Sequence, residues 1–170
     1  MPTRETDDVS RGADAVALRD VQDADLDVFF EQERDPQARR MAAFTGEDPN
    51  DRAAHDAHWA RLRSDPTVLA RTITLNGGAI GNIAKFERDG APEVTYWLGR
   101  EHWGRGLATA SLAAFLKLYT ARPLYGGAAA DNAASIRVLE KCGFVLVERK
   151  RGFAAARGEE IDEVVLKLAD

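Results

Sequence analysis

The sequence predicts a single α/β domain in which helices flank a mixed β-sheet. Its 170 residues match the length of about one average domain. The middle of the chain reads as three strands joined by turns at Asn76-Gly77-Gly78 and Asp89-Gly90-Ala91-Pro92, which indicates an antiparallel meander. The strand that ends at Leu98 is followed by a helix and then another strand, and this order implies a parallel pair.

The first part of the domain is predicted to hold one strand and three short helices. Residues Ala15–Arg19 alternate as a strand does, whereas Asp20–Arg34 has apolar residues at helical spacing until Asp35-Pro36 stops the helix. Further helices are predicted over Pro36–Phe44 and Pro49–Ser64. We expect these helices to form a lid or a flank of a folded domain that spans residues 14–170, preceded by a flexible polar leader over residues 1–13.

The later elements alternate between strand and helix periods. The meander is predicted to consist of strands over Val68–Leu75, Ala79–Glu87 and Glu93–Leu98. The elements expected after it are a helix over Gly106–Ala121, a strand over Leu124–Ala129, a helix over Asn132–Cys142, and strands over Phe144–Arg149 and Glu163–Leu168. A loop is expected over Gly152–Gly158, and the acidic residues after it are expected to be solvated, namely Glu159, Glu160, Asp162 and Glu163.

Composition and charge exclude several classes of protein. Hydrophobic residues make up 45% and charged residues 30% of the chain, which is typical of a soluble globular protein and excludes general disorder. The net charge of −5 argues against binding to nucleic acid or to an anionic membrane. The single cysteine, Cys142, cannot form an intrachain disulfide, and the first residues contain no apolar run, so we expect a cytoplasmic protein.

A glycine-rich turn connects the strand that ends at Leu98 to the next helix. Gly104 and Gly106 permit a tight backbone path, and the free amide groups at the following helix start would bind a phosphate or pyrophosphate. The dinucleotide pattern G-x-G-x-x-G fails because Thr109 takes the third position, and the NTPase loop G-x-x-x-x-G-K-[ST] does not occur. The glycines alone favour a phosphate site and a plain strand-to-helix connection equally.

A second segment, over residues 132–144, decides between these alternatives. It reads N-x-x-S-x-R-V-L-E-K-C-G-F, and together with W-G-R-G-L-A-T over residues 103–109 it resembles the GNAT acyltransferase superfamily. The similarity is closest to the RimJ/RimL-like branch of N-acetyltransferases and covers roughly residues 15–168. It implies a splayed mixed sheet, acetyl-CoA as co-substrate, no metal, and direct transfer of an acetyl group to a primary amine of a protein N-terminus or a small molecule.

The resemblance also assigns a binding site for CoA. The pantetheine arm is expected to lie between the strands over Glu93–Leu98 and Leu124–Ala129, and the diphosphate on the amides after Trp103. The residues implied in binding CoA are Leu98, Trp103, Gly104, Arg105, Gly106, Leu107, Ala108, Thr109, Asn132, Ser135 and Arg137. Trp103 stands where the superfamily's loop has Gln or Arg, which leaves the backbone cradle intact. For Arg137 an ion pair with Glu140 or Glu148 is an equal alternative.

Three residues are implied in catalysis. The backbone N–H of Leu98 would polarise the thioester carbonyl, Glu93 would accept the proton of the amine through a water, and Ser135 would protonate the departing thiolate. For Glu93 a solvated position at the start of a strand is an open alternative, and for Asn132 and Ser135 so is helix capping. Many relatives carry a tyrosine acid where this chain has Leu139, so a tyrosine at that position is excluded.

Other readings stay open at this stage. His55, Asp56 and His58 resemble a helix-borne metal site but lack a third strong ligand, so no metal is expected. A non-catalytic acyl-CoA-binding module with the same fold is the rival to an enzyme. The identity of the amine acceptor does not follow from the sequence, and a homodimer is compatible with it without being indicated.

Overall fold

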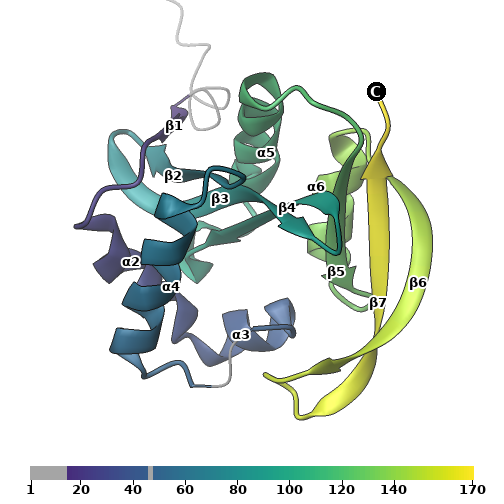
Figure 1. The fold of residues 1–170 in the computed structure, drawn as a ribbon, viewed down its shortest axis with the longest axis horizontal. Coiled ribbons are helices and arrows are strands. Elements are labelled where there is room, and N and C mark those ends of the chain that lie inside the picture. The colour runs from purple at the N-terminus through teal and green to yellow at the C-terminus, as the bar shows by residue number, and fades with distance from the viewer. Residues whose placement is uncertain (1–14, 46–47) are drawn as a thin grey trace, which may run out of the picture.

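The computed structural model describes residues 15–45 and 48–170. Over this part of the chain, seven strands form one sheet in the order β1-β2-β3-β4-β5-β7-β6, with helices on both of its faces (Figure 1). The single mixed α/β domain predicted from the sequence is therefore confirmed. The leader over residues 1–13 lies outside the described residues and stays a prediction.

The elements follow the predicted order with shifted ends. The strands are Val16–Arg19 (β1), Leu69–Leu75 (β2), Gly78–Arg88 (β3), Ala91–Leu98 (β4), Leu124–Ala129 (β5), Val145–Ala154 (β6) and Glu159–Leu168 (β7). The helices are Asp25–Glu33 (α2), Pro36–Ala42 (α3), Arg52–Ser64 (α4), Leu107–Leu118 (α5) and Ala133–Lys141 (α6), with a 3-10 turn at Arg100–His102.

The hairpin between β2 and β3 forms as its turn residues require. Asn76 and Gly77 both have positive φ, at 52° and 84°, which is the conformation that a tight turn between right-twisted strands needs. Asp89 and Gly90 repeat this pattern between β3 and β4, with φ of 52° and 79°. All pairings among β2, β3 and β4 are antiparallel, as the meander predicted.

Helix α2 begins five residues later than predicted, because the buried carboxylate of Asp25 is held by hydrogen bonds from other elements. Its carboxylate accepts hydrogen bonds from both terminal nitrogens of Arg19, at 2.6 and 2.8 Å, and from the backbone N–H of Gln22. The Thr72 hydroxyl donates a further bond of 2.7 Å. These contacts hold residues 20–24 as a loop between β1 and α2.

We expect Asp25→Asn to lower the free energy of unfolding by about 2 kcal/mol at pH 7. The hydrogen bond and charge of Arg19 hold the pKa of the Asp25 carboxyl at about 2 in the folded chain, below its usual 3.8. This stabilisation is present above pH 3.8 and is lost as the pH falls from there towards 2. Urea unfolding at several pH values measures it; a difference between variant and wild type that does not shrink on acidification would contradict the assignment.

The last two strands are longer than predicted and form one hairpin. The ladder between β6 and β7 continues through Gly152↔Ile161 to Ala154↔Glu159, so the predicted loop over Gly152–Gly158 is wrong for residues 152–154, and only residues 155–158 form the turn. The chain reverses only after Ala154, and Gly158 takes a positive φ of 68°. Glu163 is consequently a buried residue of β7, at 7% exposure, instead of a solvated loop residue.

The parallel strands β4 and β5 pair over two residues and then diverge. Their register contains only Glu93↔Tyr125 and Val94↔Gly126, although β4 pairs with β3 along its whole length and β5 pairs fully with β7. Each of the two strands thus has one satisfied edge and one edge that faces a gap. The splayed sheet implied by the family resemblance is confirmed.

The two faces of the sheet near this gap differ. Val94 and Leu98 of β4 point into the main hydrophobic core, together with Leu107 and Phe115 of α5 and Leu139 of α6. Because side chains alternate along a strand, Glu93, Thr95 and Trp97 point to the opposite face. Helices α2, α3 and α4 lie beside that face in Figure 1, and the gap between β4 and β5 joins the two sides.

Candidate active site

The glycine turn leaves a run of amide groups without backbone acceptors. Before the turn, the N–H of Trp103 donates a hydrogen bond to the carbonyl of Arg100. After it, the N–H of Ala110 donates to the carbonyl of Gly106, and no backbone bond is described for the amides between these two. The amides between them belong to the loop and the first helical turn, where no intrahelical acceptor exists. The amide groups left available are those of residues 104–109.

The backbone of this turn is open to a ligand. Gly104 and Gly106 have φ of 73° and 74°, and a Cβ added to either would meet no atom within 4 Å. Gly106 is the N-cap of α5 and makes no side-chain cap bond, so the positive end of the helix is uncovered. The residues present therefore fit the diphosphate of a CoA-type carrier.

Basic side chains stand beside this cradle. Arg137 and Lys141 of α6 line the same cavity, and Arg137 forms no ion pair with Glu140 or Glu148 in the described part of the chain. Arg105 does not line the cavity, and its part in binding CoA stays a prediction. Arg100 instead contacts Asp35 at 3.0 Å and Gln37 at 2.7 Å, which ties the loop to α3.

The end of β4 presents its backbone to the gap. The N–H of Gly99 donates to the carbonyl of Ile80, so the neighbouring pair Gly81↔Leu98 is a non-hydrogen-bonded pair of the ladder. The N–H and C=O of Leu98 consequently point away from β3 and into the gap. The indole N–H of Trp103 donates to that carbonyl at 3.1 Å, which holds the strand end in place.

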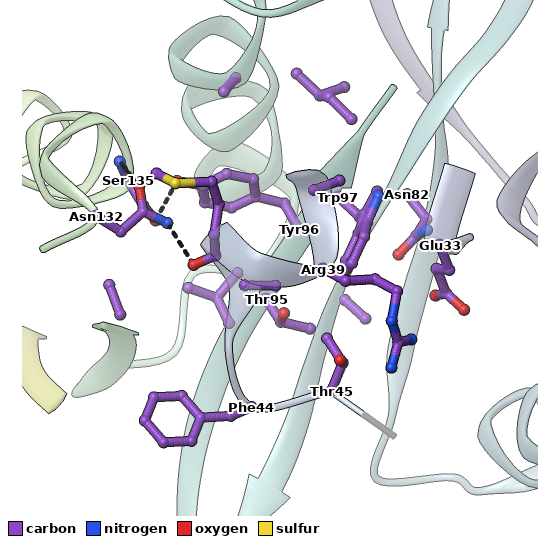
Figure 2. Close-up of a pocket in the computed structure, with 18 of the residues that line it drawn as sticks. Glu33, Arg39, Phe44, Thr45, Asn82, Thr95, Tyr96, Trp97, Asn132 and Ser135 are labelled. Atoms are coloured by element: carbon purple, nitrogen blue, oxygen red, sulfur yellow. Dashed lines mark hydrogen bonds between the residues drawn. The ribbon is translucent and has the colours of Figure 1, made fainter. Parts of the chain in front are cut away.

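A tyrosine from β4 meets the start of α6 at the gap. The hydroxyl groups of Tyr96 and Ser135 lie 2.9 Å apart, and burial raises the pKa of Tyr96 to about 12, so its hydroxyl stays protonated at neutral pH. Asn132 accepts a bond from the N–H of Ser135 and donates one to the carbonyl of Met41, which joins α6 to the end of α3 (Figure 2).

Sequence reasoning missed Tyr96. The motif excludes a tyrosine acid only at the helical position that Leu139 occupies in α6. The tertiary structure brings a tyrosine hydroxyl to Ser135 from a different element. The only available signal was the alternation of β4, which puts Tyr96 on the same face as Leu98.

Glu93 lies at the apex of the gap, on the face opposite to Tyr96. Its side chain is 18% exposed, so the solvated position considered from the sequence is wrong. Burial raises the pKa of the Glu93 carboxyl, and the nearby Glu163 carboxylate raises it further. The charge of Arg88, 3.5 Å away, acts in the opposite direction. A Cβ on Gly127 would lie 3.3 Å from the Glu93 carboxylate and 3.0 Å from that of Glu163, so a glycine there gives both carboxylates room.

One cavity of about 1000 Å³ extends across the sheet and is lined by the glycine turn, Tyr96, Ser135 and Glu93. We call the side lined by Tyr96, Ser135 and the glycine turn the donor half. We call the opposite side the acceptor half; the residues that define it are Phe30, Glu33, His55, Trp59, Asn82 and Trp97. Figure 2 shows Asn132 and Ser135 on one side of the cavity and Asn82 and Glu33 on the other.

Three features of this site are those of a transferase that brings a phosphate-bearing donor to a second substrate. They are a helix start with available amides, a neighbouring gap between parallel strands, and a cavity that crosses the sheet. The chain belongs to the acetyltransferase (GNAT) domain family, whose model matches residues 16–145. The family resemblance stated from the motifs is confirmed. No curated protein matches the chain in sequence.

Solved structures of the same fold include two of the RimJ/RimL kind. Spermidine N-acetyltransferase from Vibrio cholerae, solved with CoA and spermine, has a TM-score of 0.79 at 16% identity, over 92% of this chain and 96% of its own. RimJ from Mycobacterium smegmatis, with CoA-disulfide, has 0.74 at 20% identity, over 91% and 81%. RimL, a ribosomal L7/L12 α-N-protein acetyltransferase, has 0.76 at 15% identity, over 92% and 91%. These similarities establish the fold.

In the described residues, no helix is both long enough and apolar enough to cross a membrane.

Proposed function

We propose that this protein transfers the acetyl group of acetyl-CoA directly to a primary amine. The observation that carries the proposal is the run of available amides at residues 104–109 beside the open gap between β4 and β5. A helix start of this kind binds phosphate, and an unpaired strand edge binds the amides of a pantetheine arm. CoA in the structures of the Vibrio cholerae and Mycobacterium smegmatis relatives supports the choice of carrier.

In the proposed reaction, protein groups stabilise each charge that moves. The N–H of Leu98 donates to the thioester oxygen as negative charge develops on it. The amine nitrogen forms a bond to the carbonyl carbon, and the carbon–sulfur bond breaks with its electron pair going to sulfur. The Tyr96 hydroxyl, or Ser135 hydrogen-bonded to it, donates a proton to that sulfur.

Glu93 is the proposed acceptor of the amine proton. It lies at the apex of the gap on the acceptor side of β4, and its raised pKa makes it a stronger base than an exposed carboxylate. An amine that arrives as ammonium loses one proton before attack, which bound water can carry to Glu93 and on to solvent, and one after attack, which restores the proton that Tyr96 or Ser135 donated to sulfur. Because the chain has a single cysteine, we place this activity in a reducing compartment such as the cytoplasm.

We expect Glu93→Gln to lower kcat about 100-fold at neutral pH, with little change in the KM for acetyl-CoA. The glutamine keeps the shape but cannot take a proton. Release of free CoA thiol from acetyl-CoA, recorded with a panel of amines, measures the effect. Glu160→Gln is the matched control, because Glu160 is exposed on β7.

The same assay separates an enzyme from a non-catalytic CoA-binding module. Tight binding of CoA with no thiol release from any amine would contradict the proposed transfer. Equal kcat for Glu93→Gln and wild type would remove Glu93 from the mechanism and leave the transfer itself intact.

A further inference from the structure

The acceptor half of the cavity contains buried N–H groups that have no hydrogen-bond acceptor. The side-chain nitrogens Nδ2 of Asn82, Nε1 of Trp97 and Nε1 of Trp59 are all buried without a partner among the described residues. Asn82 and Trp59 are only 7% and 3% exposed, so bulk water does not compensate them. Leaving such a donor unpaired costs about 1–3 kcal/mol, and folded proteins rarely do so without a reason.

Two of these donors belong to one site. Asn82 of β3 and Trp97 of β4 are direct partners in the antiparallel ladder, so their side chains leave the sheet on the same face and next to each other. Figure 2 shows them together on the side of the cavity that also holds Glu33. An indole N–H can only donate, so Trp97 requires an oxygen or another acceptor.

A carboxylate stands across from these donors. Glu33, the last residue of α2, lines the cavity with one oxygen 3.4 Å from Nε2 of His55. His55 is 9% exposed, burial lowers its pKa, and neither of its ring nitrogens forms a hydrogen bond. Burial also raises the pKa of the Glu33 carboxyl to about 7, against the charge of Arg39. The charge of Arg39 offsets the burial of Glu33 only in part and a neutral imidazole adds none, so an ammonium group would stabilise the charged form of Glu33.

The walls around these polar groups are aromatic. Phe30 contacts the His55 ring edge-on with centroids 5.3 Å apart, and Trp59 packs on Phe29 at 5.0 Å. The side chains of Phe30, Trp59 and Trp97 therefore surround the space next to Glu33 with apolar surface. An apolar body attached to the amine would be buried there.

We infer that the acceptor is a primary amine that also carries a carbonyl or carboxylate oxygen and an apolar side chain, as amino acids and peptide N-termini do. Glu33 takes the ammonium group, and the N–H groups of Trp97 and Asn82 take the oxygen. This inference rests on the proposed function, because it names the second substrate of that reaction. A simple alkylamine or a polyamine offers no acceptor to these donors and leaves them unpaired.

The test compares two ligands that differ only in the oxygen-bearing group. Phenylalaninamide and phenethylamine share an amine and a phenyl ring, and only the first has a carboxamide. Calorimetric titration into CoA-saturated protein is expected to give at least about ten-fold tighter binding of phenylalaninamide, since a site built for a hydrogen-bonding group rejects the analogue without it. Free phenylalanine and a Phe-Ala-Ala peptide then separate the amino-acid source from the peptide source.

Two variants remove the donors in different ways. Trp97→Phe deletes the indole N–H and keeps an aromatic ring, and it is expected to reduce the preference to about two-fold or less. Asn82→Asp replaces a donor by a carboxylate, and is expected to weaken phenylalanine binding more than phenethylamine binding. Asn76→Asp, which carries the same change in an exposed turn, is the matched control. Unchanged CoA affinity shows that each variant is folded.

Three outcomes would overturn the inference: equal or tighter binding of phenethylamine, a preference that survives both variants, or no binding of any oxygen-bearing amine to protein that binds CoA. A different result would contradict the proposed function. Selective binding of phenylalaninamide without release of CoA thiol would uphold the inference on the acceptor and refute the transfer.

Discussion

Gly106→Glu is expected to abolish binding of acetyl-CoA and CoA, with an affinity at least about 100-fold lower, because it removes two or more charge-assisted hydrogen bonds worth about 1.5–3 kcal/mol each. The substitution puts bulk and negative charge into the space that the diphosphate would occupy. A Cβ there meets no protein atom within 4 Å, so the new side chain enters the cradle instead of clashing with the fold. Isothermal titration with CoA measures the loss.

A second glycine provides the control for backbone strain. Gly90, in the turn between β3 and β4, has φ of 79° against 74° for Gly106, and a Cβ there also meets nothing within 4 Å. Gly90→Glu therefore has the same strain and the same change in charge far from the cradle. If both variants bind CoA equally well, the diphosphate does not lie at residues 104–109, and the proposed site is wrong.

Tyr96→Phe is expected to lower kcat about 100-fold with a much smaller change in the KM for acetyl-CoA, since a positioned general acid contributes about 10²–10⁴ in rate. The substitution keeps the ring in the cavity wall and removes only the hydroxyl that lies 2.9 Å from Ser135. Ser135→Ala removes the other hydroxyl of the pair. The two changes act on one proton path, so the double variant is expected to lose far less than the product of the single losses.

The choice of control makes this test specific. Tyr125→Phe makes the same change on β5 at a residue that does not line the cavity. A merely structural role for Tyr96 would lower the melting temperature and leave kcat unchanged, and that result would exclude Tyr96 as the acid. Loss of kcat with unchanged CoA affinity is the result that supports the proposed proton donor.

Much of the fold could be predicted because local chemistry dictates it. Asn76 and Gly77 can adopt the positive φ that a tight hairpin needs, so the register of β2 and β3 follows from a few residues. The predicted start of α2 and the predicted bounds of the last hairpin were wrong for the opposite reason. Asp25 starts its helix late because Arg19 and Thr72, from two strands, fix its carboxylate, and the β6–β7 ladder extends to Ala154 because pairing stabilises residues whose own pattern indicates a loop.

For the site, the sequence by itself determined the backbone cradle and the family, because a phosphate-binding helix start depends on small residues at adjacent positions. Only the tertiary structure decided which side chains meet there. Tyr96 reaches Ser135 from another element, Glu93 is partly buried near Glu163 of β7, and Asn82 is paired with Trp97 across a ladder. These contacts join residues that are far apart in the chain. Their strength depends on how deeply the side chains are buried and which way they point, and the spacing of residues along a sequence determines neither.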